Sequence, residues 1–95
     1  MTRFAEHVYT EQSDIARIES WAEQLEDEAR VEIRLADGER VEGFVTARPT
    51  IQVFRDGEGR EGMNAVVRID DQADPEHAHY LWLDRIVDIR RTGTA

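Results

Sequence analysis

The chain has 95 residues and a formal net charge of −9, from 21 acidic and 12 basic residues. This length suits one domain with one small core, and the absence of cysteine excludes disulfides and cysteine-based zinc sites. The acidic balance disfavours DNA and anionic membranes as partners, and no apolar run suits a signal peptide or a membrane span, so we expect a cytoplasmic protein.

The beginning of the chain is predicted to hold a loose end and one helix. Residues 1–12 show no clear periodicity and are expected to form a flexible N-terminal arm. Apolar side chains at helical spacing between Ile15 and Ala29 predict an amphipathic helix of about four turns. Residues 11–28 contain seven acids and one base, Arg17, so this helix should repel phosphate.

After the helix, the apolar period changes to that of β-strands. Strands are expected at residues 30–36, 40–48, 50–55, 63–70, 79–83 and, as a last short segment, 86–90. Asp37-Gly38 supplies the turn between the first two strands, and Gly43 marks a bend or a close backbone approach inside the second. The polar segments 55–62 and 71–78 are predicted to be loops.

This order of elements predicts an α+β fold that is mostly β. Closing the strands into a barrel would remove exposed strand edges, and Gly43 would provide a sharp bend. We therefore expect an N-terminal helix followed by a strongly bent, five-stranded antiparallel barrel. One domain over residues 13–91 should contain all of it.

The predicted first hairpin resembles the first motif of Sm-like (LSm-type) proteins, which fold as SH3-like barrels. The residues that carry this resemblance are Val31, Ile33, Leu35, Asp37-Gly38, Val41 and Gly43. Residues 83–89 look like the second motif, so the resemblance covers about residues 14–90. The chain is also similar to a small family of uncharacterised bacterial proteins of about this length that adopt an Sm-like barrel.

The resemblance implies candidate positions for RNA contacts. In Sm-like RNA binders, a polar side chain after the second strand reads a base, and an arginine between the last two strands contacts a nucleotide. The corresponding residues here are Gln52, with Arg48 nearby, and Arg85. The family's Asp-x-x-Met-Asn pattern is replaced at that place by RPTIQ, and we interpret the later Met63-Asn64 pair as coincidence.

Four aromatic residues occupy strand positions opposite the expected core set. They are Phe44, Phe54, Tyr80 and Trp82. One interpretation is that they pack beneath the helix and close one end of the barrel. The other is an exposed aromatic patch that binds a protein partner or stacks with bases. The arginines that would flank such a patch are Arg34, Arg48, Arg68, Arg90 and Arg91.

Few residues suggest catalysis or metal binding. His77 and His79 could form a metal pair with a nearby carboxylate, but exposed histidines on an acidic loop are the expected outcome, so no metal is predicted. No serine, histidine and aspartate occur in a recognised catalytic arrangement, and the G-x-G at Gly57 lacks a strand–helix context. We expect no enzyme activity, no catalytic residue and no cofactor.

Two functions remain open. The first is a noncatalytic module that binds a protein partner or assembles with itself, through uncharged edge strands. The second is a divergent RNA-binding Sm-like protein, acting in RNA regulation, in which Gln52, Arg48 and Arg85 share one face. The net charge favours the first.

Overall fold

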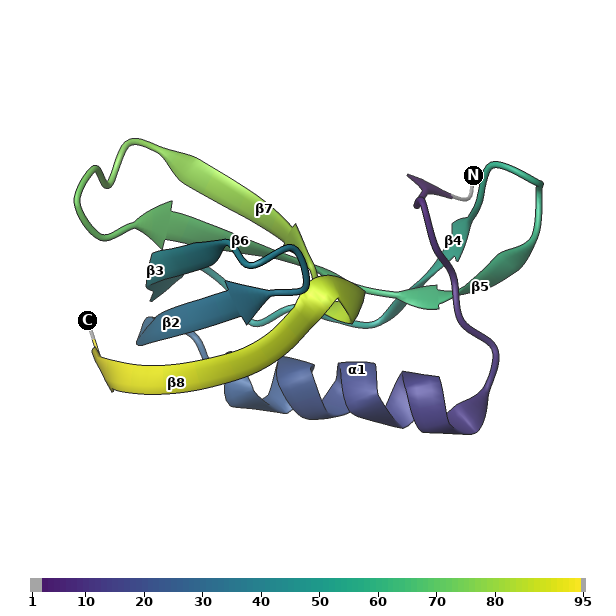
Figure 1. Cartoon of the computed structure of the whole chain (residues 1–95), viewed down its shortest axis with the longest axis horizontal. Helices are drawn as coiled ribbons and strands as arrows, with labels where there is room; N and C mark the ends of the chain where they lie inside the picture. Colours follow the sequence, from purple (N-terminus) through teal and green to yellow (C-terminus); the bar gives the residue numbers. More distant parts are fainter. Residues whose placement is uncertain (1–2, 95) are drawn as a thin grey trace.

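The computed structural model describes residues 3–94. In chain order, its elements are β1 (Arg3–Phe4), α1 (Gln12–Gln24), β2 (Ala29–Leu35), β3 (Arg40–Val45), β4 (Gln52–Arg55), β5 (Glu61–Asn64), β6 (Val66–Asp71), β7 (Ala78–Trp82), the 3-10 helix η1 (Leu83–Arg85) and β8 (Ile86–Thr94). Figure 1 shows these elements in space. No helix in this part of the chain is long and apolar enough to cross a membrane.

The strands form two sheets rather than one closed barrel. The larger sheet is antiparallel, with five strands in the order β7-β6-β3-β2-β8, and the smaller one has the order β1-β4-β5. The expectation of an α+β fold with one helix and mostly strands is confirmed. The closed barrel is wrong for residues 3–94, because the hairpin of β4 and β5 extends away from the larger sheet (Figure 1).

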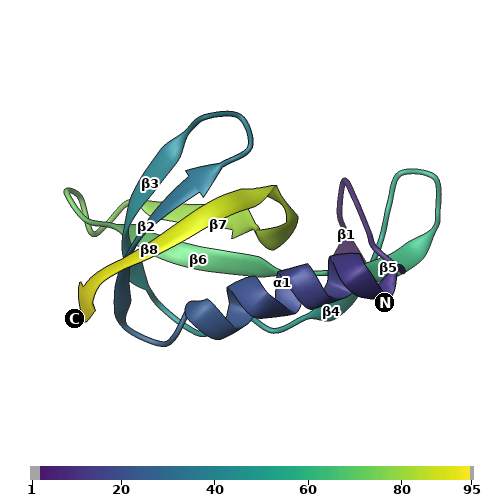
Figure 2. The same cartoon turned by 60° about the horizontal axis from the view of Figure 1, so that its bottom comes forward.

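Helix α1 lies along the underside of this arrangement and contacts β5, η1 and β8 (Figure 2). It buries Ile18 and Ala22, as the apolar stripe predicts. It ends at Gln24, earlier than the stripe suggests, because the backbone of Leu25 already leaves helical geometry, with a φ of −100° and a ψ of 67°. Glu28, with a φ of 65°, then turns the chain into β2. Acidic residues at this end also oppose the helix dipole, which favours termination here.

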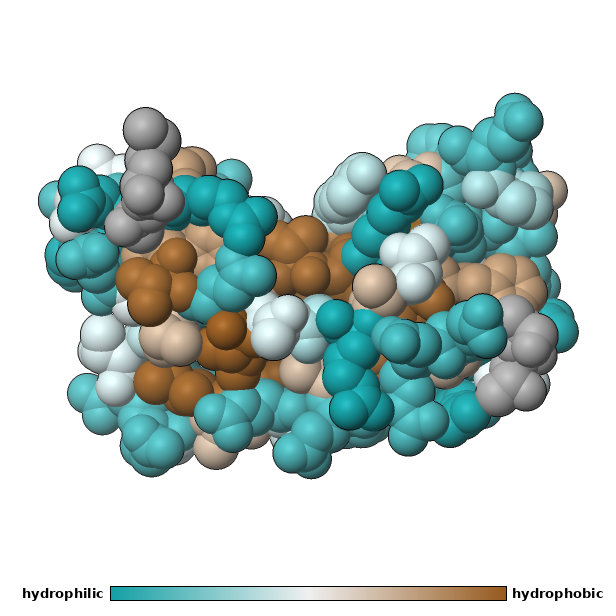
Figure 3. Space-filling view, turned by 180° about the vertical axis from the view of Figure 1, so that it is seen from behind, coloured by the Kyte–Doolittle hydropathy of each residue, from teal (hydrophilic) through white to brown (hydrophobic). Residues whose placement is uncertain are grey.

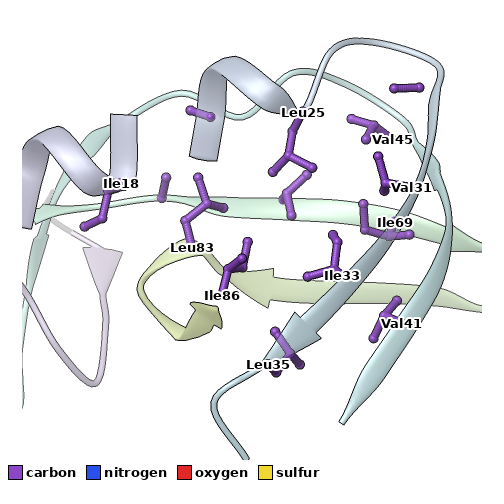
Figure 4. Close-up of a cluster of buried hydrophobic side chains, with 14 residues drawn as sticks. Ile18, Leu25, Val31, Ile33, Leu35, Val41, Val45, Ile69, Leu83 and Ile86 are labelled. Carbon is purple, nitrogen blue, oxygen red and sulfur yellow. The ribbon is translucent and has the colours of Figure 1, made fainter. Parts of the chain in front are cut away.

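One buried cluster joins the helix to the larger sheet. Its members come from α1, β2, β3, β6, η1, β8 and the adjoining turns, and Figure 4 shows their side chains converging. The predicted alternation is confirmed on β2, where Val31, Ile33 and Leu35 point into the core. The helix contributes Ile18 and β6 contributes Ile69. The helix and the larger sheet therefore share one core.

Gly43 lies where the backbones of β3 and β6 are in close contact. It pairs with Asp71 on one side and with Val31 on the other. A Cβ atom at this position would overlap the backbone carbonyl oxygen of Asp70 and lie 2.9 Å from Cγ2 of Ile69. Of the two roles predicted for Gly43, the structure therefore shows the close backbone approach between neighbouring strands.

The segment predicted to be a flexible arm lies against the hairpin of β4 and β5 over residues 3–9. Strand β1 pairs in parallel with β4, and Tyr9 forms an antiparallel bridge with Met63. Ala5 is fully buried, and the hydroxyl of Tyr9 donates a hydrogen bond of 2.9 Å to Asp84. Residues 1–2 of the predicted arm lie outside the described residues.

Candidate functional site

A groove lies between the connection from β3 to β4 and the strands β1, β4 and β6. It encloses about 220 Å³, and its lining includes Arg3 from β1, Arg48 from the connection and Arg68 from β6. We call this site the arginine groove. In Figure 3 the molecule is hollowed between one end formed by β1, β4 and β5 and another formed by β6 and β7.

The lining of the arginine groove is positive although the chain as a whole is acidic. Its lining residues all lie within residues 3–94, and none of them is an aspartate or a glutamate. Arg68 lies 3.3 Å from a carboxylate oxygen of Asp70, outside the lining, and Arg3 donates a hydrogen bond to the neutral amide of Gln52. The guanidinium group of Arg48 forms no ion pair with a described residue. The groove therefore carries excess positive charge.

Two of the three residues proposed for RNA contacts meet in this groove. Gln52 and Arg48 both line it, whereas Arg85 belongs to η1 and lies 3.6 Å from the carboxylate of Asp37. The structure adds Arg3, for which the sequence gives no signal, because its place depends on the parallel pairing of β1 with β4. The three predicted residues therefore do not share one pocket.

The four aromatic residues are divided between different environments. Phe54 is buried and meets Trp82 edge to face, with 5.1 Å between ring centroids. Tyr80 is 65% exposed, and the guanidinium carbon of Arg68 lies 6.0 Å from the centre of its ring. Phe44 is half-buried on β3. None of the four belongs to the buried cluster under α1.

Strand β7 forms a free edge of the larger sheet within residues 3–94. The amide of Leu83 donates to Ala65 and the carbonyl of His77 accepts from Asp71, so odd-numbered residues of this segment bond to β6. The backbone N–H and C=O groups of Ala78, Tyr80 and Trp82 consequently point away from β6. The strand, AHYLW, contains no acidic residue, arginine or lysine.

The two histidines lie at the loop that leads into β7. Nε2 of His79 is 2.9 Å from Oδ1 of Asp71, and the ring of His77 is 4.6 Å from that of His79. The other oxygen of Asp71 accepts hydrogen bonds from the amides of Ala73 and Asp74. The contact with His79, together with these amides, lowers the pKa of Asp71. Among the described residues, no three His, Asp or Glu side chains form a metal-binding group.

Asn64, which follows Met63 at the end of β5, has a structural role. Its side chain is 1% exposed, donates to the carbonyl of His7 at 2.8 Å and accepts from the amide of Ala65 at 2.8 Å. These bonds attach the N-terminal segment to the junction of β5 and β6. No local sequence pattern predicts this contact, because it joins residues far apart along the chain.

Comparison with known proteins identifies the family. A family model described as a domain of unknown function (DUF3247) matches residues 2–92. A crystal structure of XC5848 from Xanthomonas campestris, described as adopting a novel variant of the Sm-like motif, is 43% identical to this chain. The match covers 97% of this chain and 99% of that chain, with a TM-score of 0.91. Among the curated proteins, none matches.

These matches agree with the resemblance found in the sequence. The expectation of an uncharacterised family with an Sm-like fold is confirmed by both the family model and the solved structure. The match to the solved structure covers nearly the whole chain and so includes the hairpin of β4 and β5. The chain therefore belongs to the DUF3247 family.

Proposed function

We propose that this protein is a noncatalytic interaction module that associates with a second copy of itself through the outer edge of β7. The supporting observation is the open backbone of Ala78, Tyr80 and Trp82, which offers donors and acceptors in an uncharged strand. A free strand edge is a template for pairing with another chain, and natural proteins commonly protect such edges with charged residues. Strand β7 lacks that protection.

The opposite edge of the sheet differs in charge. Strand β8 carries Asp88, Arg90 and Arg91. Two copies of β7 could pair antiparallel around Tyr80 and form a closed dimer, with aromatic side chains opposite each other. Pairing of β7 with β8 of the next copy would instead generate a ring or a filament. Both arrangements use the same backbone groups of β7.

Light scattering coupled to size exclusion tests this proposal. We expect the wild-type protein to have a mass of two or more chains of 11.0 kDa each. Tyr80→Pro removes an outward N–H without removing a bond to β6, so it should give an 11.0 kDa monomer with an unchanged circular dichroism spectrum. Tyr80→Ala keeps that N–H and should still associate. A wild-type monomer at millimolar concentration would contradict the proposal.

A divergent RNA-binding function is the second candidate. It is supported by the meeting of Arg48 and Gln52 in the arginine groove. The distant position of Arg85 and the net charge of −9 count against it. Fluorescence anisotropy with oligouridine and oligoadenine tests it, since this function requires submicromolar, salt-dependent binding that Arg48→Ala weakens.

A further inference from the structure

We infer that the arginine groove binds the phosphate group of a small molecule, either free phosphate or a phosphate monoester. The observation behind this inference is the convergence of Arg3, Arg48 and Arg68, from three separate segments, on one groove without an acidic lining residue. This local composition opposes that of the chain, in which 21 acids outnumber 12 bases. The inference is independent of pairing at β7.

Two of the guanidinium groups are held in place by contacts that leave their charge available. Arg3 donates to the amide oxygen of Gln52, and its guanidinium carbon lies 5.8 Å from the centre of the Phe54 ring. Arg68 lies between Asp70, at 3.3 Å, and the ring of Tyr80. The carboxylates of Asp70 and of Asp27, which accepts from the backbone N–H of Arg48, offset only part of the positive charge of three arginines. Bringing like charges together is unfavourable, and a bound anion would relieve that repulsion.

Arg48 completes the site from the connection between β3 and β4. Its backbone N–H donates a hydrogen bond to the carboxylate of Asp27, which fixes the main chain beside Pro49. Its side chain has no ion-pair partner among the described residues. The guanidinium group of Arg48 is therefore available to a ligand while its backbone is anchored.

The chemistry of the groove favours phosphate over a carboxylate. A phosphate monoester carries a charge of roughly −1.5 to −2 at neutral pH and has three acceptor oxygens, whereas a carboxylate has one charge and two oxygens. Guanidinium groups bind phosphate through paired hydrogen bonds. The hydroxyl of Thr50, which also lines the groove, can donate another hydrogen bond.

The size of the groove and its aromatic ring favour a small ligand over a nucleic acid strand. About 220 Å³ is less than a typical drug-sized pocket, and it suits a phosphate with at most a sugar attached. Phe54 is only 4% exposed and already packs edge to face on Trp82, so it offers no free surface for a base. Sequence-tolerant RNA binding commonly depends on such stacking.

The test is a titration of the full chain, followed by two-dimensional ¹H–¹⁵N NMR, with inorganic phosphate and with ribose 5-phosphate. We expect saturable shifts confined to the residues around the groove, which are Arg3, residues 46–54 and the neighbourhood of Arg68. Arg48→Ala should raise the dissociation constant by about tenfold, the effect of losing one charge-assisted hydrogen bond. It keeps the backbone N–H that bonds to Asp27, so folding should be unaffected.

Arg34→Ala is the matched control, because Arg34 is exposed on β2, lies outside the groove and has the same charge. It should change the dissociation constant less than twofold. At least tenfold tighter binding of ribose 5-phosphate would identify a monoester as the ligand, and equal binding would identify free phosphate. Absent or scattered shifts, equal losses in both variants, or tighter binding of oligouridine than of ribose 5-phosphate would overturn the inference.

Discussion

Replacing Gly43 with alanine should destabilise the fold, because the added Cβ meets main chain rather than a movable side chain. That atom would overlap the carbonyl oxygen of Asp70, so β3 must move away from β6. Overpacking costs about 1–3 kcal/mol, and each weakened ladder hydrogen bond adds about 1 kcal/mol. We expect the free energy of unfolding to fall by about 3 kcal/mol, which lowers Tm by about 12–24 °C in a domain of this size.

Urea unfolding monitored by tryptophan fluorescence measures this change. Gly57→Ala is the control, since a Cβ there would meet nothing within 4 Å and Gly57 does not have a positive φ. That substitution should leave stability unchanged or raise it by up to about 1 kcal/mol, because alanine restricts the unfolded chain. If Gly43→Ala is as stable as Gly57→Ala, the proposed close approach of β3 and β6 is wrong.

Three further predictions concern polar contacts. Burial and the hydrogen bond to Asp84 raise the pKa of Tyr9 from 10.0 to about 12, so its contribution to stability is complete below pH 10 and falls between there and about pH 12. Tyr9→Phe should cost about 1 kcal/mol at neutral pH and remove this alkaline dependence in thermal unfolding. Because the pKa of Asp71 is lowered in the folded state, its contribution to stability is present above pH 3.8 and is lost as the pH falls through the folded-state pKa. Asp71→Asn should therefore flatten the acid side of a plot of urea midpoint against pH. Asn64→Ala should cost about 2–3 kcal/mol in urea unfolding, because two buried hydrogen bonds are lost.

Each of these predictions has a contrary outcome. An alkaline transition in Tyr9→Phe identical to that of the wild type would show that Tyr9 is not the titrating group. If Asp71→Asn has the same acid profile as the wild type, the bond between Asp71 and His79 is not the source of the loss of stability at low pH. Gln52→Ala, at an exposed amide, is the control for Asn64→Ala, and equal stabilities of these two variants would contradict the structural role of Asn64.

Local patterns in the sequence predicted the parts of the fold that depend on neighbouring residues. The alternation of Val31, Ile33 and Leu35 predicted which face of β2 is buried, because side chains alternate across a strand. The spacing of Ile18 and Ala22 predicted the buried face of α1 in the same way. These features need no knowledge of which strands pair.

Features that depend on contacts between distant residues were not predictable in this way. A closed barrel was expected, but the pairing of β4 with β5 and β1 creates a separate sheet. Arg3 reaches the arginine groove only because β1 lies beside β4, and no period in the first residues indicates that pairing. Arg48 and Gln52 were candidates for a shared site, and the same topology that brings them together places Arg85 elsewhere.

Hydrogen exchange at β7 tests the proposed self-association most directly. At low protein concentration, the amides of Tyr80 and Trp82 should exchange quickly, whereas those of His79 and Leu81, which bond to β6, should be protected. At high concentration we expect Tyr80 and Trp82 to become protected as a second chain pairs with the edge. Fast exchange of both amides at every concentration would contradict the account.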